Sequence, residues 1–88
     1  MNQHYQIILK GNFQQSGFRF HAFQAAHDCS IRGQVSERHG NIIIEAEGDE
    51  QDMEKFLKWC YSSQGTTPPE SIMVVKKPLA YYDKFLIL

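Results

Sequence analysis

A nine-residue stretch near the start of the chain, Gly11-Asn12-Phe13-Gln14-Gln15-Ser16-Gly17-Phe18-Arg19, constrains the fold more than any other part of the sequence. An apolar, strand-like run from Tyr5 to Leu9 precedes it, and a helix-like run from Phe20 to Cys29 follows it. A strand that turns tightly into a helix gathers main-chain N–H groups without intrahelical partners, where the helix dipole adds partial positive charge. The stretch therefore predicts an anion cradle, and Arg19 at its exit supplies a planar fork of donors suited to phosphate.

Alternating apolar and polar side chains predict four strands, over residues 4–10, 31–36, 42–47 and 71–77. A turn at residues 38–41, with Gly40 at a positive φ, joins the second strand to the third. The apolar residues Phe85 to Leu88 predict a short last strand that adds at a sheet edge.

Two segments show the periodicity of amphipathic helices. The first runs from about Phe18 to Cys29, and its predicted buried stripe is Ala22, Phe23, Ala26 and Cys29. The second follows an N-cap at Asp49, and its predicted buried stripe is Met53, Phe56, Leu57 and Cys60. A loop from Gly65 to Pro69 ends the second helix.

The order of these elements is βαββαβ followed by a terminal strand. We therefore predict an α+β fold of the ferredoxin-like, split βαβ type: an antiparallel sheet with two helices on one face and a short extra C-terminal strand. A length of 88 residues suits one domain, so residues 1–88 are assigned to a single domain.

Composition argues against several classes of protein. The formal net charge is −1 and the pI is about 6.4, whereas nucleic-acid-binding domains are usually basic. No apolar run approaches the ~20 residues that a membrane span needs, and the first residues carry no secretory signal. The chain is therefore expected to be cytoplasmic, with neither a nucleic acid nor a membrane as partner.

The cysteines and histidines of the sequence do not suggest a metal site. Cys29 and Cys60 lack the spacing of metal ligands and are too few for a disulfide framework, so both are expected to be reduced and buried. The four histidines are scattered along the chain. We expect no metal.

Residues 11–19 resemble the acylphosphatase family, whose pattern here reads Gly-x-Val-Gln-Gly-Val-x-Phe/Tyr-Arg. Four residues keep this pattern and its spacing: Gly11, Gln14, Phe18 and Arg19. Phe13 replaces the first valine, while Gln15 and Ser16 stand where the family has glycine and its second valine. The resemblance continues at Ile31–Val35, similar to the second strand of the family, and at Glu45–Asp49, similar to the turn into the second helix. It implies the same ferredoxin-like fold.

The resemblance also implies a hydrolase that cleaves the carboxyl–phosphate bond of small acyl phosphates, giving carboxylate and phosphate. Such a mechanism depends on positioning and charge stabilisation, and it requires no cofactor and no covalent intermediate. The phosphate would lie in the cradle and be clamped by Arg19. The implied phosphate-binding residues are Gln14, Gln15, Ser16, Gly17, Phe18 and Arg19. The expected partner is a small acyl phosphate or inorganic phosphate, and the chain is expected to be a monomer.

Glu37 occupies the position at which the family carries an asparagine that orients the attacking water. Together with Arg19 it is our catalytic candidate. Two unit charges about 4 Å apart at an effective dielectric of about 20 repel by about 4 kcal/mol, so an ionised Glu37 beside phosphate would weaken binding or turnover. A protonated Glu37 would instead donate a hydrogen bond, and a carboxylate held away from the phosphate would serve as a general base.

Two classes of function therefore stay open: an acyl phosphate hydrolase with weakened activity, and a catalytically inactive module that binds an anion or a protein. Gln15 bears on this choice, because a glutamine at a position of positive φ costs roughly 1 kcal/mol and would reshape the cradle. Phe13 and Phe18, which flank the cradle, are predicted to pack in the core rather than to stack on RNA.

Overall fold

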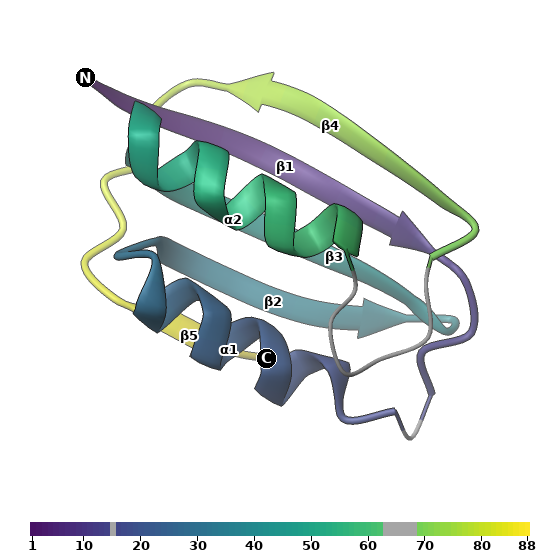
Figure 1. Cartoon of the computed structure of the whole chain (residues 1–88). Helices are drawn as coiled ribbons and strands as arrows, with labels where there is room; N and C mark the ends of the chain where they lie inside the picture. The colour runs from purple at the N-terminus through teal and green to yellow at the C-terminus, as the bar shows by residue number, and fades with distance from the viewer. Residues whose placement is uncertain (15, 63–68) are drawn as a thin grey trace.

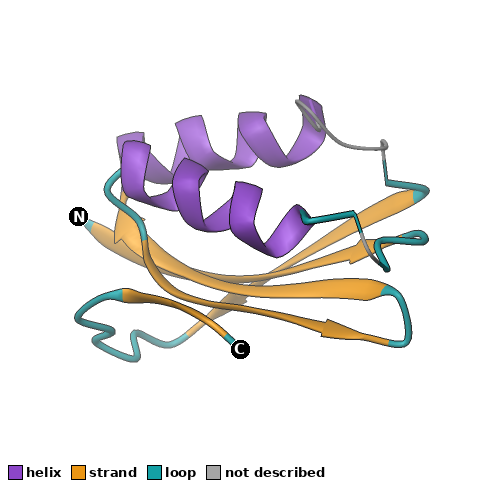
Figure 2. Cartoon of the chain, turned by 90° about the horizontal axis from the view of Figure 1, so that it is seen from below, coloured by secondary structure: helices purple, strands orange, loops and turns teal. Residues whose placement is uncertain are grey.

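The computed structural model describes residues 1–14, 16–62 and 69–88, in which two α-helices cover one face of a five-stranded sheet (Figures 1 and 2). The elements are, in order, β1 (Asn2–Lys10), α1 (Phe18–Asp28), β2 (Arg32–Arg38), β3 (Asn41–Asp49), α2 (Glu50–Ser62), β4 (Ser71–Lys77) and β5 (Phe85–Ile87). The predicted loop from Gly65 to Pro69 lies outside the described residues except at Pro69. Among the described residues, neither helix is long and apolar enough to cross a membrane.

The strand order across the sheet is β4-β1-β3-β2-β5. The first four strands pair antiparallel with their neighbours, which confirms the predicted βαββαβ arrangement. β5 adds at the edge next to β2 and runs parallel to it, so the complete sheet is mixed. The short last strand therefore pairs within the chain (Figure 1).

The hydrophobic core lies between the helices and the inner face of the sheet (Figure 2). The inner face buries alternate strand residues completely: Ile7, Leu9, Val35, Ile42 and Ile44. α1 packs on them mainly through small residues, because Ala22, Ala25 and Ala26 are buried. Cys29, which was predicted to be buried, is half-buried. The predicted stripe was wrong for Phe23, which is 41% exposed. Its ring lies at the sheet edge, 6.3 Å from the ring of Phe85 in β5, while Phe18 fills the core instead.

α2 begins as its sequence predicts, and its predicted stripe is buried except at Leu57, which is half-buried. The N–H of Gln51 donates to Oδ2 of Asp49 at 3.1 Å, so Asp49 caps the helix. Met53, Phe56 and Cys60 are buried against the sheet. Burial raises the pKa of the Cys60 thiol to about 12, which makes it a core group rather than a nucleophile.

Candidate active site

The loop that leaves β1 is fastened to the turn between β2 and β3. The N–H of Phe13 donates to the carbonyl oxygen of Gly40 at 2.9 Å, and the N–H of Gly11 donates to Oδ1 of Asn41 at 3.2 Å. The two-residue turn itself requires positive φ values, 54° at His39 and 84° at Gly40. The position of the loop therefore depends on the conformation of this turn. The sequence had predicted the turn and the positive φ of Gly40.

Asn41 is a site residue that the sequence analysis missed. The sequence analysis placed it only in the turn at residues 38–41. The structure gives it a different part, because its side chain accepts a hydrogen bond from the first residue of the loop. The one sequence signal for this role was that Asn41, an amide residue, directly follows Gly40, the glycine of the hairpin turn.

Two aromatic rings anchor the loop from the core side. Phe13 is 2% exposed and Phe18 is 1% exposed. Their ring centroids lie 4.9 Å apart, and the ring of Trp59 from α2 lies 5.4 Å from that of Phe18. Both phenylalanines are therefore core residues, as predicted, and they hold the two ends of the loop against the helices.

Ser16 shapes the turn into α1. Its N–H and its hydroxyl both donate to the carbonyl oxygen of Phe13, at 3.2 and 2.6 Å. The same hydroxyl oxygen accepts the N–H of Phe18 at 3.2 Å. Gly17 then caps α1 at φ 73°, a left-handed conformation that glycine adopts without strain.

These bonds decide which main-chain donors of the predicted cradle remain available. The N–H groups of Ser16 and Phe18 have partners inside the loop. The N–H groups of Gln14 and Gly17 meet no acceptor among the described residues. Gln15 lies outside the described residues, so its predicted contribution stays a prediction.

Arg19 lies in the first turn of α1 and reaches across to the end of the sheet. Its Nη1 donates to the main-chain oxygen of Leu88 at 2.7 Å. Leu88 in turn donates its N–H to the carbonyl oxygen of Val35 in β2 at 2.8 Å. No Asp or Glu side chain pairs with the guanidinium in the part of the chain that the structure describes, and its other N–H groups can receive an anion.

Glu37 lies at the same end of the sheet. It follows Val35 by two residues in β2 and pairs with the fully buried Ile42, which places it on the face that the helices cover. It is half-buried, and no cation of the described residues pairs with it. No hydrogen bond joins it directly to Arg19; the two are linked through Leu88, which bonds the strand that carries Glu37.

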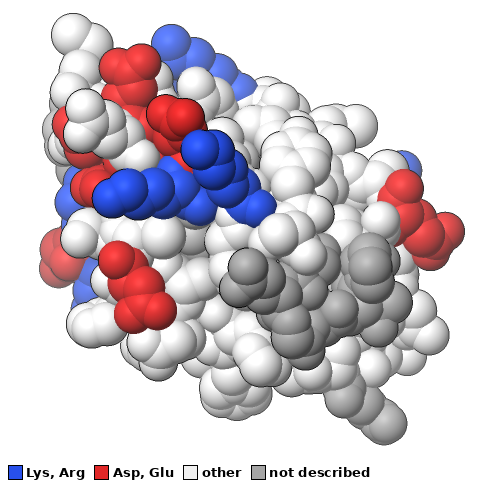
Figure 3. Space-filling view, viewed as in Figure 1, with Lys and Arg blue, Asp and Glu red and all other residues white. Residues whose placement is uncertain are grey.

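Lys58 of α2 differs from Arg19 in its surroundings. Figure 3 shows lysine and arginine side chains beside aspartate and glutamate side chains over α2. One such pair is Lys58 and Glu54, 3.7 Å apart at i,i+4 and well exposed. Their charge is therefore locally balanced, whereas no Asp or Glu side chain of the described residues pairs with Arg19.

Known proteins resemble this chain in sequence and in fold. The family model described as Acylphosphatase matches residues 5–85. An acylphosphatase of Clostridium acetobutylicum is 33% identical over 85 residues, which cover 96% of this chain and 93% of that protein. The crystal structure of acylphosphatase from Bacillus subtilis matches at a TM-score of 0.86 and 27% identity, covering 100% of this chain and 99% of that one. Full-length HypF in the phosphate- and nucleotide-bound form matches at a TM-score of 0.86 and 29% identity, covering 100% of this chain and 12% of HypF.

Proposed function

The chain belongs to the acylphosphatase family, and from this we propose that it hydrolyses the carboxyl–phosphate bond of small acyl phosphates. The observation that carries the proposal is the position of Arg19. Arg19 is carried by the N-terminal turn of α1, beside a loop whose Gln14 and Gly17 N–H groups meet no acceptor among the described residues. No Asp or Glu side chain of those residues pairs with its guanidinium. Such an arrangement suits a dianionic phosphoryl group.

In the proposed reaction, Arg19 and the N–H groups of Gln14 and Gly17 bind the phosphoryl oxygens. The 11-residue helix α1 adds the positive end of its dipole. The oxygen of a water molecule forms a bond to phosphorus while the bond from phosphorus to the acyl oxygen breaks. The acyl group leaves as a carboxylate and the water gives up a proton to solvent. Stabilisation of the negative charge on the phosphoryl oxygens supplies most of the rate enhancement.

We assign Glu37 to the position that orients the attacking water, with weakened activity as the consequence. A carboxylate accepts hydrogen bonds from water but, unlike an asparagine amide, it donates none when ionised. An ionised Glu37 also repels a bound phosphate, by about 4 kcal/mol at about 4 Å and an effective dielectric of about 20. We therefore expect slow turnover, which an amide at this position would accelerate.

The second candidate is a catalytically inactive module that keeps the fold and binds an anion or a protein partner. The observation in its favour is that Nη1 of Arg19 is already engaged by the main-chain oxygen of Leu88. If this contact persists when a ligand binds, Arg19 has one donor fewer to offer. The donors that remain would suffice to bind a simple anion but would stabilise a transition state less well.

We propose that residues 1–88 act as one domain and as a monomer in the cytoplasm. The pairing of β5 with β2 of the same chain supports a monomer, because the last strand needs no neighbouring molecule.

The decisive experiment measures hydrolysis of benzoyl phosphate by the native protein, Arg19→Ala, Glu37→Asn and the control Lys58→Ala. We expect slow native activity, its loss in Arg19→Ala, an increase in Glu37→Asn and no change in Lys58→Ala. A native protein and a Glu37→Asn variant that are both inert would reject the hydrolase and favour the binding module. Equal activity of Arg19→Ala and the native protein would remove Arg19 from the mechanism.

A further inference from the structure

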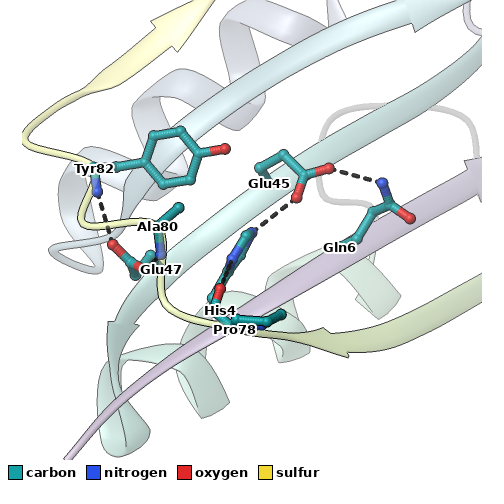
Figure 4. A network of polar contacts seen from close by, with 7 residues as sticks. All are labelled: His4, Gln6, Glu45, Glu47, Pro78, Ala80 and Tyr82. Atoms are coloured by element: carbon teal, nitrogen blue, oxygen red, sulfur yellow. Dashed lines mark hydrogen bonds and ion pairs between the residues drawn. The ribbon is translucent and has the colours of Figure 1, made fainter.

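A row of polar side chains crosses the sheet face that the helices leave open. The strand registers place Lys77, His4, Glu47 and Arg32 side by side on β4, β1, β3 and β2. Strand alternation assigns such residues to solvent, yet His4 is 6% exposed and Glu47 is 1% exposed. Both are covered by the connector between β4 and β5, residues 78–84, which passes over this face (Figure 4).

Glu47 holds the connector through its main-chain donors. Its Oε2 accepts the N–H of Ala80 at 2.7 Å, and its Oε1 accepts the N–H of Tyr82 at 2.8 Å. Burial by itself raises the pKa of Glu47, but the hydrogen bonds from the connector and the charge of His4 outweigh it and leave the pKa below its ordinary value. Glu47 is therefore a carboxylate whose charge is satisfied by the connector that it holds.

His4 holds the same connector one step earlier. Its Nδ1 lies 2.7 Å from the carbonyl oxygen of Pro78, which accepts hydrogen bonds only, so Nδ1 is the donor. Its Nε2 lies 2.8 Å from Oε1 of Glu45, and Oε2 of Glu45 accepts Nε2 of Gln6 at 2.9 Å. Main-chain groups at residues 78, 80 and 82 are thus each bound to a buried side chain on the sheet (Figure 4).

Arg32 completes the attachment from β2. Its Nε donates to the carbonyl oxygen of Tyr82 at 2.9 Å. Both main-chain groups of Tyr82 are therefore bound to the sheet, one to Glu47 and one to Arg32.

The connector leads directly into β5, which has three residues and pairs on one side only. The carbonyl oxygen of Lys84 accepts the N–H of Gly33 at 2.9 Å, and the parallel pairing then continues to Val35 and Ile87. Directly after β5, Leu88 bonds Val35 and receives the guanidinium of Arg19. An unbroken series of contacts thus runs from Glu47 to Arg19, although the two residues belong to opposite sides of the sheet.

We propose that Glu47, together with His4, is a positioning residue for Arg19. By fixing the connector it fixes the register of β5, and β5 sets the place of the Leu88 oxygen that holds the guanidinium. A three-residue edge strand has little pairing of its own to resist slippage, so its position depends on the segment that leads into it. The effect of Glu47 on phosphate binding rests on the proposed function. The effect of Glu47 on the order of the Arg19 side chain does not.

The test compares the native protein with Glu47→Gln and with the control Glu54→Gln, which makes the same charge change on the exposed face of α2. In ligand-free protein, ¹⁵N relaxation of the Arg19 Nε–H group and hydrogen exchange of the Leu88 amide report positioning directly. We expect exchange at Leu88 to be about tenfold faster and Arg19 to be more mobile in Glu47→Gln, with no change in Glu54→Gln. Should Glu47→Gln not fold, Arg32→Met removes one connector bond and is expected to show the same changes.

Phosphate affinity, measured by calorimetry, completes the test. We expect Glu47→Gln to bind phosphate about tenfold more weakly than the native protein, and to cause no further loss in an Arg19→Ala background. An equal loss in both backgrounds, or an Arg19 side chain that keeps its order in Glu47→Gln, overturns the inference. A native protein that binds no phosphate, with Arg19 released by Glu47→Gln, rejects the proposed function and leaves the positioning role supported.

Discussion

The guanidinium of Arg19 donates a hydrogen bond to the main-chain oxygen of Leu88 at 2.7 Å, across a separation of 69 residues in the chain. The contact joins the first turn of α1 to the residue after β5. It holds the arginine at the end of the sheet where β2 carries Glu37. The geometry of the candidate site is therefore set by the arrangement of the strands as much as by the glycine-containing loop.

Inorganic phosphate is expected to stabilise the native protein against thermal unfolding. A ligand at 100 times its Kd adds about 2.7 kcal/mol to the free energy of unfolding. Arg19→Ala should abolish this protection, because it removes the planar donor fork of the site. The measurement is the Tm by differential scanning calorimetry with and without phosphate. Lys58→Ala should keep the full shift, and a native protein whose Tm does not respond would argue against any phosphate site.

Replacing Asn41 is expected to loosen the loop. Asn41→Ala removes the acceptor for the N–H of Gly11 and should lower the free energy of unfolding by about 1 kcal/mol. Phosphate binding should weaken as well, because the loop loses one of its two bonds to the turn. The measurements are urea unfolding and phosphate titration, with the exposed Asn12→Ala as control. Equal phosphate affinity in the two variants would show that the loop holds its shape without Asn41.

Local patterns in the sequence predicted most of the fold. Residues 71–77 alternate as a strand and form one, and Gly40 marks the hairpin turn that the structure contains. Asp49 caps α2 as predicted, because a capping side chain acts on the neighbouring main chain. These features depend on residues close in sequence, and for that reason they could be read without the structure.

The contacts that complete the site depend on residues far apart in sequence. Alternation assigned Glu47 to the solvent face, and only the connector at residues 78–84, which has no periodic pattern, buries it. The partner of Arg19 could not be predicted either, because nothing in the sequence near Leu88 indicates a contact with α1. Long-range contacts of irregular segments leave no signature in a single sequence.

Gly33 and Gly17 form a matched pair of glycines for testing the fold. A Cβ at Gly33 would lie 1.7 Å from the carbonyl oxygen of Glu45 in β3, at a φ of 140°. Gly33→Ala should therefore push β2 away from β3 and cost several kcal/mol of stability, roughly 4 or more. At Gly17, φ is 73°, and beyond its two chain neighbours no atom of the described residues lies within 4 Å of the added Cβ, so Gly17→Ala should cost about 1–2 kcal/mol. The measurement is urea unfolding, and equal losses in the two variants would contradict the close approach of the strands.

Acid should destabilise the protein partly through Glu47. Its pKa is below the ordinary value of 4.5 in the folded protein, despite the opposing effect of burial, because the connector N–H groups and the charge of His4 favour the carboxylate. A carboxyl group with a lowered folded-state pKa contributes stability that is fully present above its unfolded pKa. That stability is lost as the pH falls through its folded pKa. Glu47→Gln should therefore be less stable than the native protein above about pH 4.5, and the difference should shrink as the pH falls below that value.

The measurement for this prediction is urea unfolding of the native protein and Glu47→Gln at intervals from pH 7 down to pH 2. Asp49 also has a lowered pKa, chiefly through its hydrogen bond with the amino group of Met1, so it contributes to acid unfolding in both proteins. Because this contribution is common to the two proteins, it cancels in the difference between them. The exposed Glu54→Gln should follow the native curve throughout. A stability difference for Glu47→Gln that stays constant from pH 7 to pH 2 would mean that the connector is held without the charge of Glu47.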